Sequence, residues 1–237
     1  EIYVATLDKE FRPITIKHLP LLHARANFGR EDPRFFRHNG ELCLEYIGVA
    51  GKFGPTHVLY ARLSESFDVL EKFAPHYGRR KAWEKNWGFF SHGGELFAVY
   101  SISPHKVLRI DGNQAELAYE ESNPFPWIGE DIQRRGGASP QLVNGEWWSF
   151  FHDRITRNGR QCYRTGFYAF EDKPPFRPIR QLPEPILWPS DEPHDNYADV
   201  AFTCGAVVEK DRVVLSSGMH DRWIEIHAID RRAVEDA

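Results

Sequence analysis

The chain has 237 residues, of which 14% are aromatic and one is methionine, and this length and composition favour one all-β domain with a substantial core. Its net charge is −4 and its acidic and basic residues are interspersed, which excludes the basic surface that nucleic acids or anionic membranes attract. The chain has no apolar run of about 18 residues, no N-terminal signal segment, and three widely separated cysteines. We therefore expect free thiols, a cytoplasmic location and no membrane contact.

The predicted strands begin with an apolar segment at residues 2–7, which precedes four stretches of one recurring pattern. In each stretch an apolar strand, a polar turn and a second apolar strand are followed by a third strand. Two of the turns, Asn39-Gly40 and Asn144-Gly145, have the residue pair that two-residue β-hairpins prefer. The four stretches cover residues 35–63, 88–111, 141–170 and 205–230.

The spacing of the turns indicates a β-propeller. They lie at residues 39, 93, 144 and 210, which are 54, 51 and 66 residues apart, close to the roughly 40 to 50 residues of familiar propeller blades. We therefore predict an all-β fold, a five-bladed β-propeller in which residues 1–237 form a single domain. Four blades follow the leading strand, and the fifth lies upstream or is completed by the two chain ends. A plain β-sandwich is the alternative, and one short helix is expected near residues 65–73.

Polar residues just before an apolar strand are the first candidates for ligand contact, because the inner strands of a propeller begin at its central funnel. The first of these is the run Glu31-Asp32-Pro33-Arg34. Proline removes an amide donor and favours an extended conformation for the residue before it. We therefore expect Asp32 to be held extended at a strand entrance, where it can donate a proton, although the same run also fits an ordinary turn.

Two basic loops and two histidines complete the candidates. Residues 79–87 combine cations with two tryptophans before the second blade, which suits a phosphate or a sugar. The run Arg134-Arg135-Gly136-Gly137 has paired glycines that allow the backbone to approach a ligand closely. His152 ends an apolar strand, and His220 lies in the fourth blade. No HExxH, Cys/His or GxSxG pattern occurs, so neither a structural zinc site nor a serine hydrolase is predicted.

The order of these motifs resembles a known family. The acidic run at residues 31–34 is followed by Glu84-Lys85-Asn86 and later by Gly218-Met219-His220-Asp221, and residues 202–207 are similar to the segment before the family's last blade. From about Gly29 to Asp230 the chain resembles glycoside hydrolase family 130, whose five-bladed propellers include β-mannoside phosphorylases.

The resemblance implies an activity and a set of site residues. Asp32 is the single carboxylic acid that delivers a proton towards the glycosidic oxygen, through a sugar hydroxyl, and inorganic phosphate is the attacking co-substrate. A nucleophile that arrives as an anion needs fixed cations and no second catalytic carboxylate. The residues implied to bind phosphate are Lys85, His152, Tyr163 and either Arg79 or Arg80. The substrate-binding set is Glu31, Arg34, Asn86 and Asp221. Within it, Asp221 is implied to bind the sugar, Asn86 follows the phosphate lysine, and Glu31 and Arg34 are implied to orient Asp32.

We therefore predict an inverting glycoside phosphorylase that acts on β-mannosides or similar oligosaccharides and needs no cofactor, no metal and no nucleic acid; the oligomeric state stays open. The family's early Asn-Pro-Ser/Gly segment is absent from residues 1–31, and Gly137-Ala138-Ser139-Pro140 replaces its Gly-Thr-Pro, which indicates a divergent substrate. Three alternatives remain. They are a propeller that binds carbohydrate without turnover, an inverting hydrolase that uses water, and an arabinanase-like site built from Asp8, Asp131 and Glu146.

Overall fold

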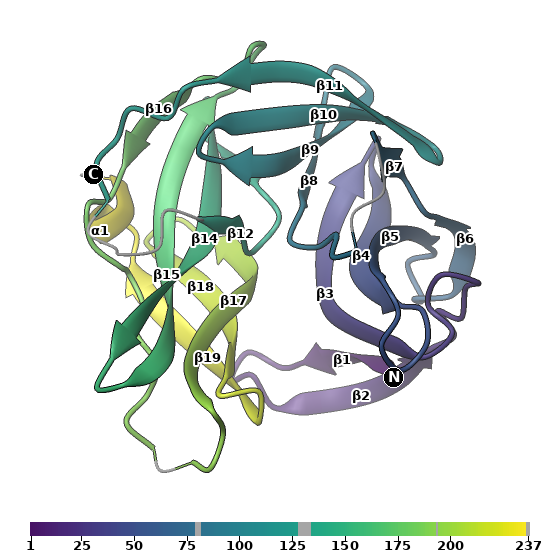
Figure 1. Ribbon diagram of the computed structural model, residues 1–237, viewed down its shortest axis with the longest axis horizontal. Helices are drawn as coiled ribbons and strands as arrows, with labels where there is room; N and C mark the ends of the chain where they lie inside the picture. Colours follow the sequence, from purple (N-terminus) through teal and green to yellow (C-terminus); the bar gives the residue numbers. More distant parts are fainter. Residues whose placement is uncertain (79–81, 128–133, 193, 236–237) are drawn as a thin grey trace.

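The computed structural model describes residues 1–78, 82–127, 134–192 and 194–235. Its strands are arranged in groups around one axis, which is seen end-on in Figure 1, so the predicted all-β fold is confirmed. Hydrogen bonds join the strands into four sheets, and the largest sheet combines two groups through the parallel pairing of β15 (Arg160–Glu171) with β17 (Ala198–Val208). Helix α1 (Arg232–Glu235) is four residues long. Among the described residues no helix has the length and apolarity to cross a bilayer.

The leading strand belongs to a hairpin that the sequence did not predict. Strand β1 (Ile2–Leu7) pairs antiparallel with β2 (Pro13–Leu19). Ile2, Val4 and Leu19 are buried on one face of this ribbon and pack against the neighbouring four-stranded sheet. The hairpin is therefore attached to the rest of the fold by its apolar face.

The four-stranded sheet corrects the prediction of a helix near residues 65–73. Strand β6 lies there instead, because Phe73 pairs with Tyr60 in register and stacks on its ring at 4.6 Å between centroids. The turn before β6 is closed by a hydrogen bond from the Asp68 amide to the Ser64 hydroxyl, at 2.9 Å. The strands of this sheet are β3 (Gly29–His38), β4 (Glu41–Val49), β5 (Thr56–Leu63) and β6 (Val69–Phe73).

The hairpin turns of the first three predicted stretches are confirmed. In Asn39-Gly40, Gly93-Gly94 and Asn144-Gly145 both residues have positive φ, between 50° and 84°, as a type I′ turn requires. The next sheet contains β7 (His76–Tyr77), β8 (Gly88–His92), β9 (Glu95–Ile102), β10 (His105–Asp111) and β11 (Gln114–Glu121). The remaining strands are β12 (Arg135–Gly136), β13 (Gln141–Val143), β14 (Glu146–Arg157), β16 (Pro178–Gln181), β18 (Arg212–Met219) and β19 (Trp223–Asp230).

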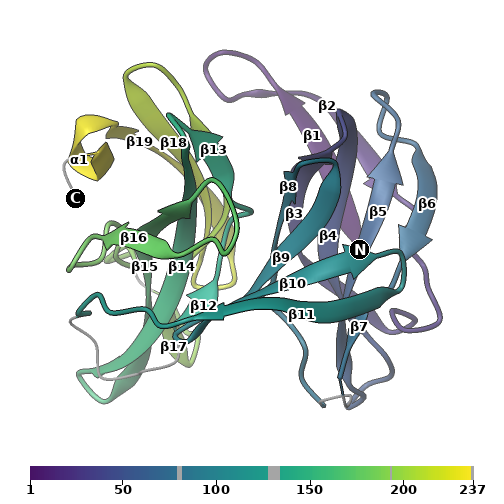
Figure 2. The same cartoon turned by 90° about the horizontal axis from the view of Figure 1, so that it is seen from above.

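Buried apolar side chains form four clusters, each between neighbouring groups of strands. The first cluster lies between β1–β2 and β4–β5, the second between β3–β5 and β8–β10, the third between β8–β10 and β14–β15, and the fourth between β13–β15 and β17–β18. A two-layer sandwich would have a single core between two sheets, so this arrangement favours the propeller over the sandwich. Within the described part of the chain no sheet closes on itself, and Figure 2 shows β1–β2 and β18–β19 on separate sides of the molecule.

Candidate functional site

One cavity of about 550 Å³, which we call the site cavity, brings together most of the residues predicted for the site. Its lining comes from β3, the loop before β8, strands β12, β14, β15 and β17, and the turn after β18. The predicted residues that line it are Glu31, Asp32, Lys85, Asn86, His152, Tyr163 and Asp221. Four lining residues were not assigned to the site from the sequence: Arg135, Tyr197, Val200 and Phe202. Arg79 and Arg80 lie outside the described residues.

Asp32 is not extended as predicted. Its φ is +53°, which places it in the left-handed region that only a few per cent of non-glycine residues adopt. The cause is a β-bulge, because Glu31 pairs with Ile47 and Arg34 with Glu45, so that β3 has one residue more than β4 in this interval. The bulge turns the backbone at Asp32 and directs its side chain to the site cavity.

Three residues of the site cavity share this unusual backbone conformation. Asn86 has a φ of +65° and Asp221 a φ of +56°, like Asp32. Left-handed non-glycine residues cost of order 1 to 3 kcal/mol each and persist only where the surrounding structure fixes them. Their concentration in one cavity is typical of a functional site.

Carboxylates and one lysine lie close together in the site cavity. The Lys85 ammonium is 3.9 Å from a Glu31 carboxylate oxygen. Burial raises the pKa of Glu31, and the charges of Asp32 and Asp221 raise it further, while Lys85 lowers it. Because these charges act on one carboxyl group, the predicted acid and the predicted phosphate lysine face the same small volume.

His152 is a neutral side chain in this site. It is buried, and burial, followed by the charges of Arg34, Arg135 and Lys85, lowers its pKa to about 3. Its ring packs edge-on against Phe202, with 4.7 Å between centroids, and its Nδ1 has no hydrogen-bond partner among the described atoms. A neutral imidazole does not supply positive charge to a ligand in the cavity.

Arg34 lies behind the site cavity and does not line it, so the predicted substrate contact is corrected to a supporting position. Its side chain and that of Glu45 are both 0% exposed. The guanidinium donates to Glu45 Oε1 at 2.8 Å, to the Trp87 carbonyl at 2.9 Å and to Asn86 Oδ1 at 3.1 Å. Since the Asn86 oxygen is engaged from behind, its amide nitrogen is the group left to act as a donor towards the cavity.

Glu45 is a fully buried carboxyl group beside the Arg34 guanidinium. Burial raises its pKa to about 7, although the Arg34 charge beside it acts in the opposite direction. The Arg34 guanidinium also lies 5.4 Å from the centroid of the Phe202 ring. Phe202 in turn lines the site cavity. The buried pair thus supports the cavity through both Asn86 and Phe202.

Arg135 is a cation of the site that was not assigned to it from the sequence, although the run at residues 134–137 was recognised. It lines the site cavity and lies opposite His152 in the pairing of β12 with β14. The glycines that follow pack closely against the protein backbone. A Cβ on Gly136 would be 2.3 Å from the Asn86 carbonyl oxygen, and one on Gly137 would be 2.7 Å from a backbone oxygen. The missing side chains of these glycines permit close backbone packing, which brings Arg135 and Asn86 close together.

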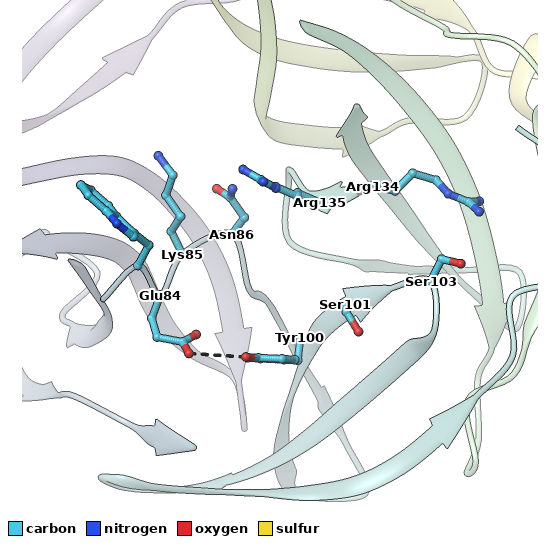
Figure 3. Close-up of a pocket in the computed structure, with 9 residues that line it drawn as sticks. Glu84, Lys85, Asn86, Tyr100, Ser101, Ser103, Arg134 and Arg135 are labelled. Atoms are coloured by element: carbon cyan, nitrogen blue, oxygen red, sulfur yellow. Dashed lines mark hydrogen bonds between the residues drawn. The ribbon is translucent and has the colours of Figure 1, made fainter. Parts of the chain in front are cut away.

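A second cavity of about 590 Å³ adjoins the site cavity. The two cavities share Lys85, Asn86 and Arg135, which we call the shared wall. Figure 3 shows these three side chains beside one another and Glu84 directed towards Tyr100, with which it shares a hydrogen bond of 3.4 Å. The other residues lining the second cavity are Trp83, Ser101, Ser103 and Arg134.

The arabinanase-like alternative is not supported by the positions of its residues. Asp8 accepts hydrogen bonds within its own turn from Arg12, at 2.7 Å and 2.9 Å. Glu146 accepts a hydrogen bond of 2.9 Å from Arg180. Neither carboxylate lines the site cavity, and Asp131 lies outside the described residues. The two that can be placed therefore do not converge with Asp32.

His194, Asp199 and His220 each place one potential metal ligand within 4.8 Å of the others. Both ring nitrogens of His220 are already engaged, Nδ1 by the Val200 amide at 3.1 Å and Nε2 by a backbone carbonyl oxygen at 3.1 Å. The Arg160 guanidinium lies 3.2 Å from the Asp199 carboxylate. Hydrogen bonds and an ion pair therefore account for this cluster, and we assign no metal to it.

Solved structures with related folds include a mannobiose phosphorylase and glycoside hydrolases. A β-1,2-mannobiose phosphorylase from Listeria innocua matches with a TM-score of 0.70 and 18% identity, over 94% of this chain and 65% of its own. A glycosyl hydrolase from Bacteroides ovatus matches with a TM-score of 0.66 and 16% identity, over 88% of this chain and 67% of its own. A structure of family 130 glycoside hydrolases that target β-1,2-mannosidic linkages in Candida mannan gives the same values. Such identities show a shared fold, and the chain spans about two thirds of the length of these proteins.

The sequence itself matches a family model described as β-1,4-mannooligosaccharide phosphorylase, over residues 22–236. A comparison with curated protein sequences gives no match. The family model covers most of the chain, including every described residue of the site cavity. The chain therefore belongs to glycoside hydrolase family 130, whose members are phosphorylases or glycoside hydrolases that act on mannosides.

Proposed function

We propose that this chain is an inverting β-mannoside phosphorylase with Asp32 as its single catalytic acid and inorganic phosphate as its nucleophile. The observation that carries the proposal is that Asp32 and Lys85 line one cavity together with His152 and Tyr163. A phosphate anion needs fixed positive charge and hydrogen-bond donors, and a general acid must be within reach of the oxygen that leaves. Both requirements meet in this cavity.

In the proposed reaction a phosphate oxygen forms a bond to the anomeric carbon of the mannosyl unit while the glycosidic C–O bond breaks on the opposite face. Asp32 supplies a proton, passed through a sugar hydroxyl, to the oxygen of the leaving sugar. A β-linked mannoside thereby yields α-mannose 1-phosphate and a shortened saccharide. The attacking oxygen is already anionic, so this route needs no second carboxylate as a base.

Each remaining side chain has a role that follows from its charge and position. Lys85 and Arg135 balance the negative charge of phosphate, while neutral His152 and the Tyr163 phenol add hydrogen bonds. Asp221, at the turn after β18, accepts hydrogen bonds from sugar hydroxyls.

We also propose that the strand groups are blades of a five-bladed propeller and that they form one domain. The proposed reaction needs no metal. The free thiols fit a protein of the cytoplasm, which is the location we propose.

Hydrolysis is the second candidate, because three carboxylates line the site cavity. An inverting hydrolase needs one carboxylate to donate a proton and another to activate water. Glu31, beside Asp32, is the available base. The two cations that line the same cavity, Lys85 and Arg135, favour phosphate as the acceptor.

The test is product analysis with β-1,2- and β-1,4-mannobiose, with and without inorganic phosphate, using Asp32→Asn as the control. We expect mannose 1-phosphate that depends on phosphate and is lost in the variant. Free mannose formed equally well without phosphate would establish hydrolysis instead. Binding of mannobiose by calorimetry with no product of either kind would leave a carbohydrate-binding propeller as the correct assignment.

A further inference from the structure

The two adjoining cavities differ in the sign of the charge that lines them. The site cavity has three carboxylates, Glu31, Asp32 and Asp221, against the two cations of the shared wall. Among the described residues, the second cavity is lined by the same two cations and Arg134, together with the carboxylate of Glu84. A cavity lined by one sign of charge raises the local concentration of the opposite ion. An inorganic anion is therefore attracted to the second cavity, and within the site cavity its place is beside the shared wall.

Two hydrogen bonds fix the position of Glu84, the acidic residue among the described lining of the second cavity. Glu84 accepts hydrogen bonds from the Tyr100 hydroxyl at 3.4 Å and from Trp87 Nε1 at 3.3 Å. Its carboxylate is thereby held on the Tyr100 side of the cavity, whereas Lys85 and Arg135 lie at the shared wall (Figure 3). The positive charge of the second cavity is thus concentrated where it meets the site cavity.

We propose that inorganic phosphate reaches the shared wall through the second cavity, while the mannoside occupies the site cavity. This inference rests on the proposed use of phosphate and adds a separate entry route to it. A neutral sugar in the site cavity would cover the shared wall from one side only, because Lys85, Asn86 and Arg135 line both cavities. Phosphate can then bind to the sugar-loaded enzyme, and the two substrates bind in either order.

The experiment is rapid-quench phosphorolysis by the wild-type chain in two mixing orders. In one, enzyme loaded with mannobiose is mixed with phosphate; in the other, enzyme loaded with phosphate is mixed with mannobiose. The first order gives the association rate constant of phosphate for the sugar-loaded enzyme, and inhibition of that phase by added sulfate checks that an anion site is being measured. We expect phosphorolysis to proceed at the same rate in the two mixing orders, within about two-fold.

Charge substitutions in the second cavity provide the matched test. Ser103 is exposed, lines the second cavity and does not line the site cavity. One unit charge acting on phosphate across a solvated cavity changes its association about two- to five-fold at low salt, so Ser103→Glu lowers the rate constant and Ser103→Lys raises it. Both effects disappear at about 0.5 M salt. Ser66→Glu adds the same charge in the turn before β6, away from both cavities, and leaves the rate constant unchanged.

The outcomes separate this inference from the proposed function. The separate route is overturned if phosphorolysis is ten-fold or more slower when mannobiose is loaded first. It is also overturned if neither charge at Ser103 changes the rate constant. In either case phosphorolysis has been observed, and the proposed function stands. If mannobiose is cleaved without phosphate, the proposed function fails, and the entry route fails with it.

Discussion

Replacing Arg34 with methionine would remove three hydrogen bonds and leave the Glu45 carboxyl group buried without its cation. Both side chains are 0% exposed, and removing one partner of a buried ion pair costs about 3 to 5 kcal/mol. We expect the free energy of unfolding to fall by that amount in a urea titration. This is a large part of the roughly 5 to 15 kcal/mol that stabilises a typical domain.

The double variant Arg34→Met/Glu45→Met separates stability from positioning. It removes both buried charges and keeps similar volume, so we expect it to recover most of the lost stability. Asn86 Oδ1 would still lack its donor, and a misplaced binding group costs on the order of 100-fold in rate. We therefore expect kcat/KM for mannobiose phosphorolysis to stay about 10- to 100-fold below that of the wild type. A double variant with full activity would refute the view that Arg34 positions Asn86.

Three further predictions concern single residues. The pKa of Glu45 is about 7 in the folded chain and 4.5 in the reference state. Its contribution to the free energy of unfolding, about 3 kcal/mol, is therefore fully present below pH 4.5 and is lost as the pH rises through 7. Glu45→Gln should give a flatter pH profile of unfolding free energy over that range. Gly136→Ala should lower the melting temperature by at least about 5 °C and abolish turnover, because its Cβ would meet the Asn86 carbonyl at 2.3 Å, whereas Gly205→Ala, with nothing nearer than 3.5 Å, is the control. Asp32→Asn should melt within about 2 °C of the wild type, since asparagine tolerates positive φ, while Asp32→Ala should lose about 1 kcal/mol; a well-folded but equally active Asp32→Asn would remove the acid from its proposed role.

Features of the fold that depend on adjacent residues were predictable from the sequence. The Asn39-Gly40 and Asn144-Gly145 turns have positive φ at both positions, which few other residue pairs allow without strain. The segment of strand β6 was wrongly predicted as a helix. The strand is stabilised by the stacking of Phe73 on Tyr60, which lies 13 residues earlier in the chain. Local periodicity does not encode such a contact.

The site residues were predictable as a set of motifs, but not in their conformations or contacts. Proline disfavours only the helical region for the residue before it, and extended Asp32 was the ordinary expectation. The bulge in β3 could not be anticipated, because it depends on the pairing of Arg34 with Glu45 on β4. Arg135 was not assigned to the site because it lies near His152 only through the pairing of β12 with β14. The sequence does not reveal the pairing of such short strands.

The buried Arg34–Glu45 pair connects the two chemical halves of the proposed site. Arg34 follows Asp32 by two residues on the same bulged strand, and its guanidinium holds Asn86 on the shared wall. Both Asp32 and Asn86 have positive φ, a conformation that persists only when surrounding contacts over-determine it. The buried ion pair supplies one such contact to Asn86 through the Arg34 guanidinium, and Arg34 lies on the same strand as Asp32. We expect this pair to fix Asp32 and the shared wall relative to each other, as the proposed in-line displacement between two bound reactants requires.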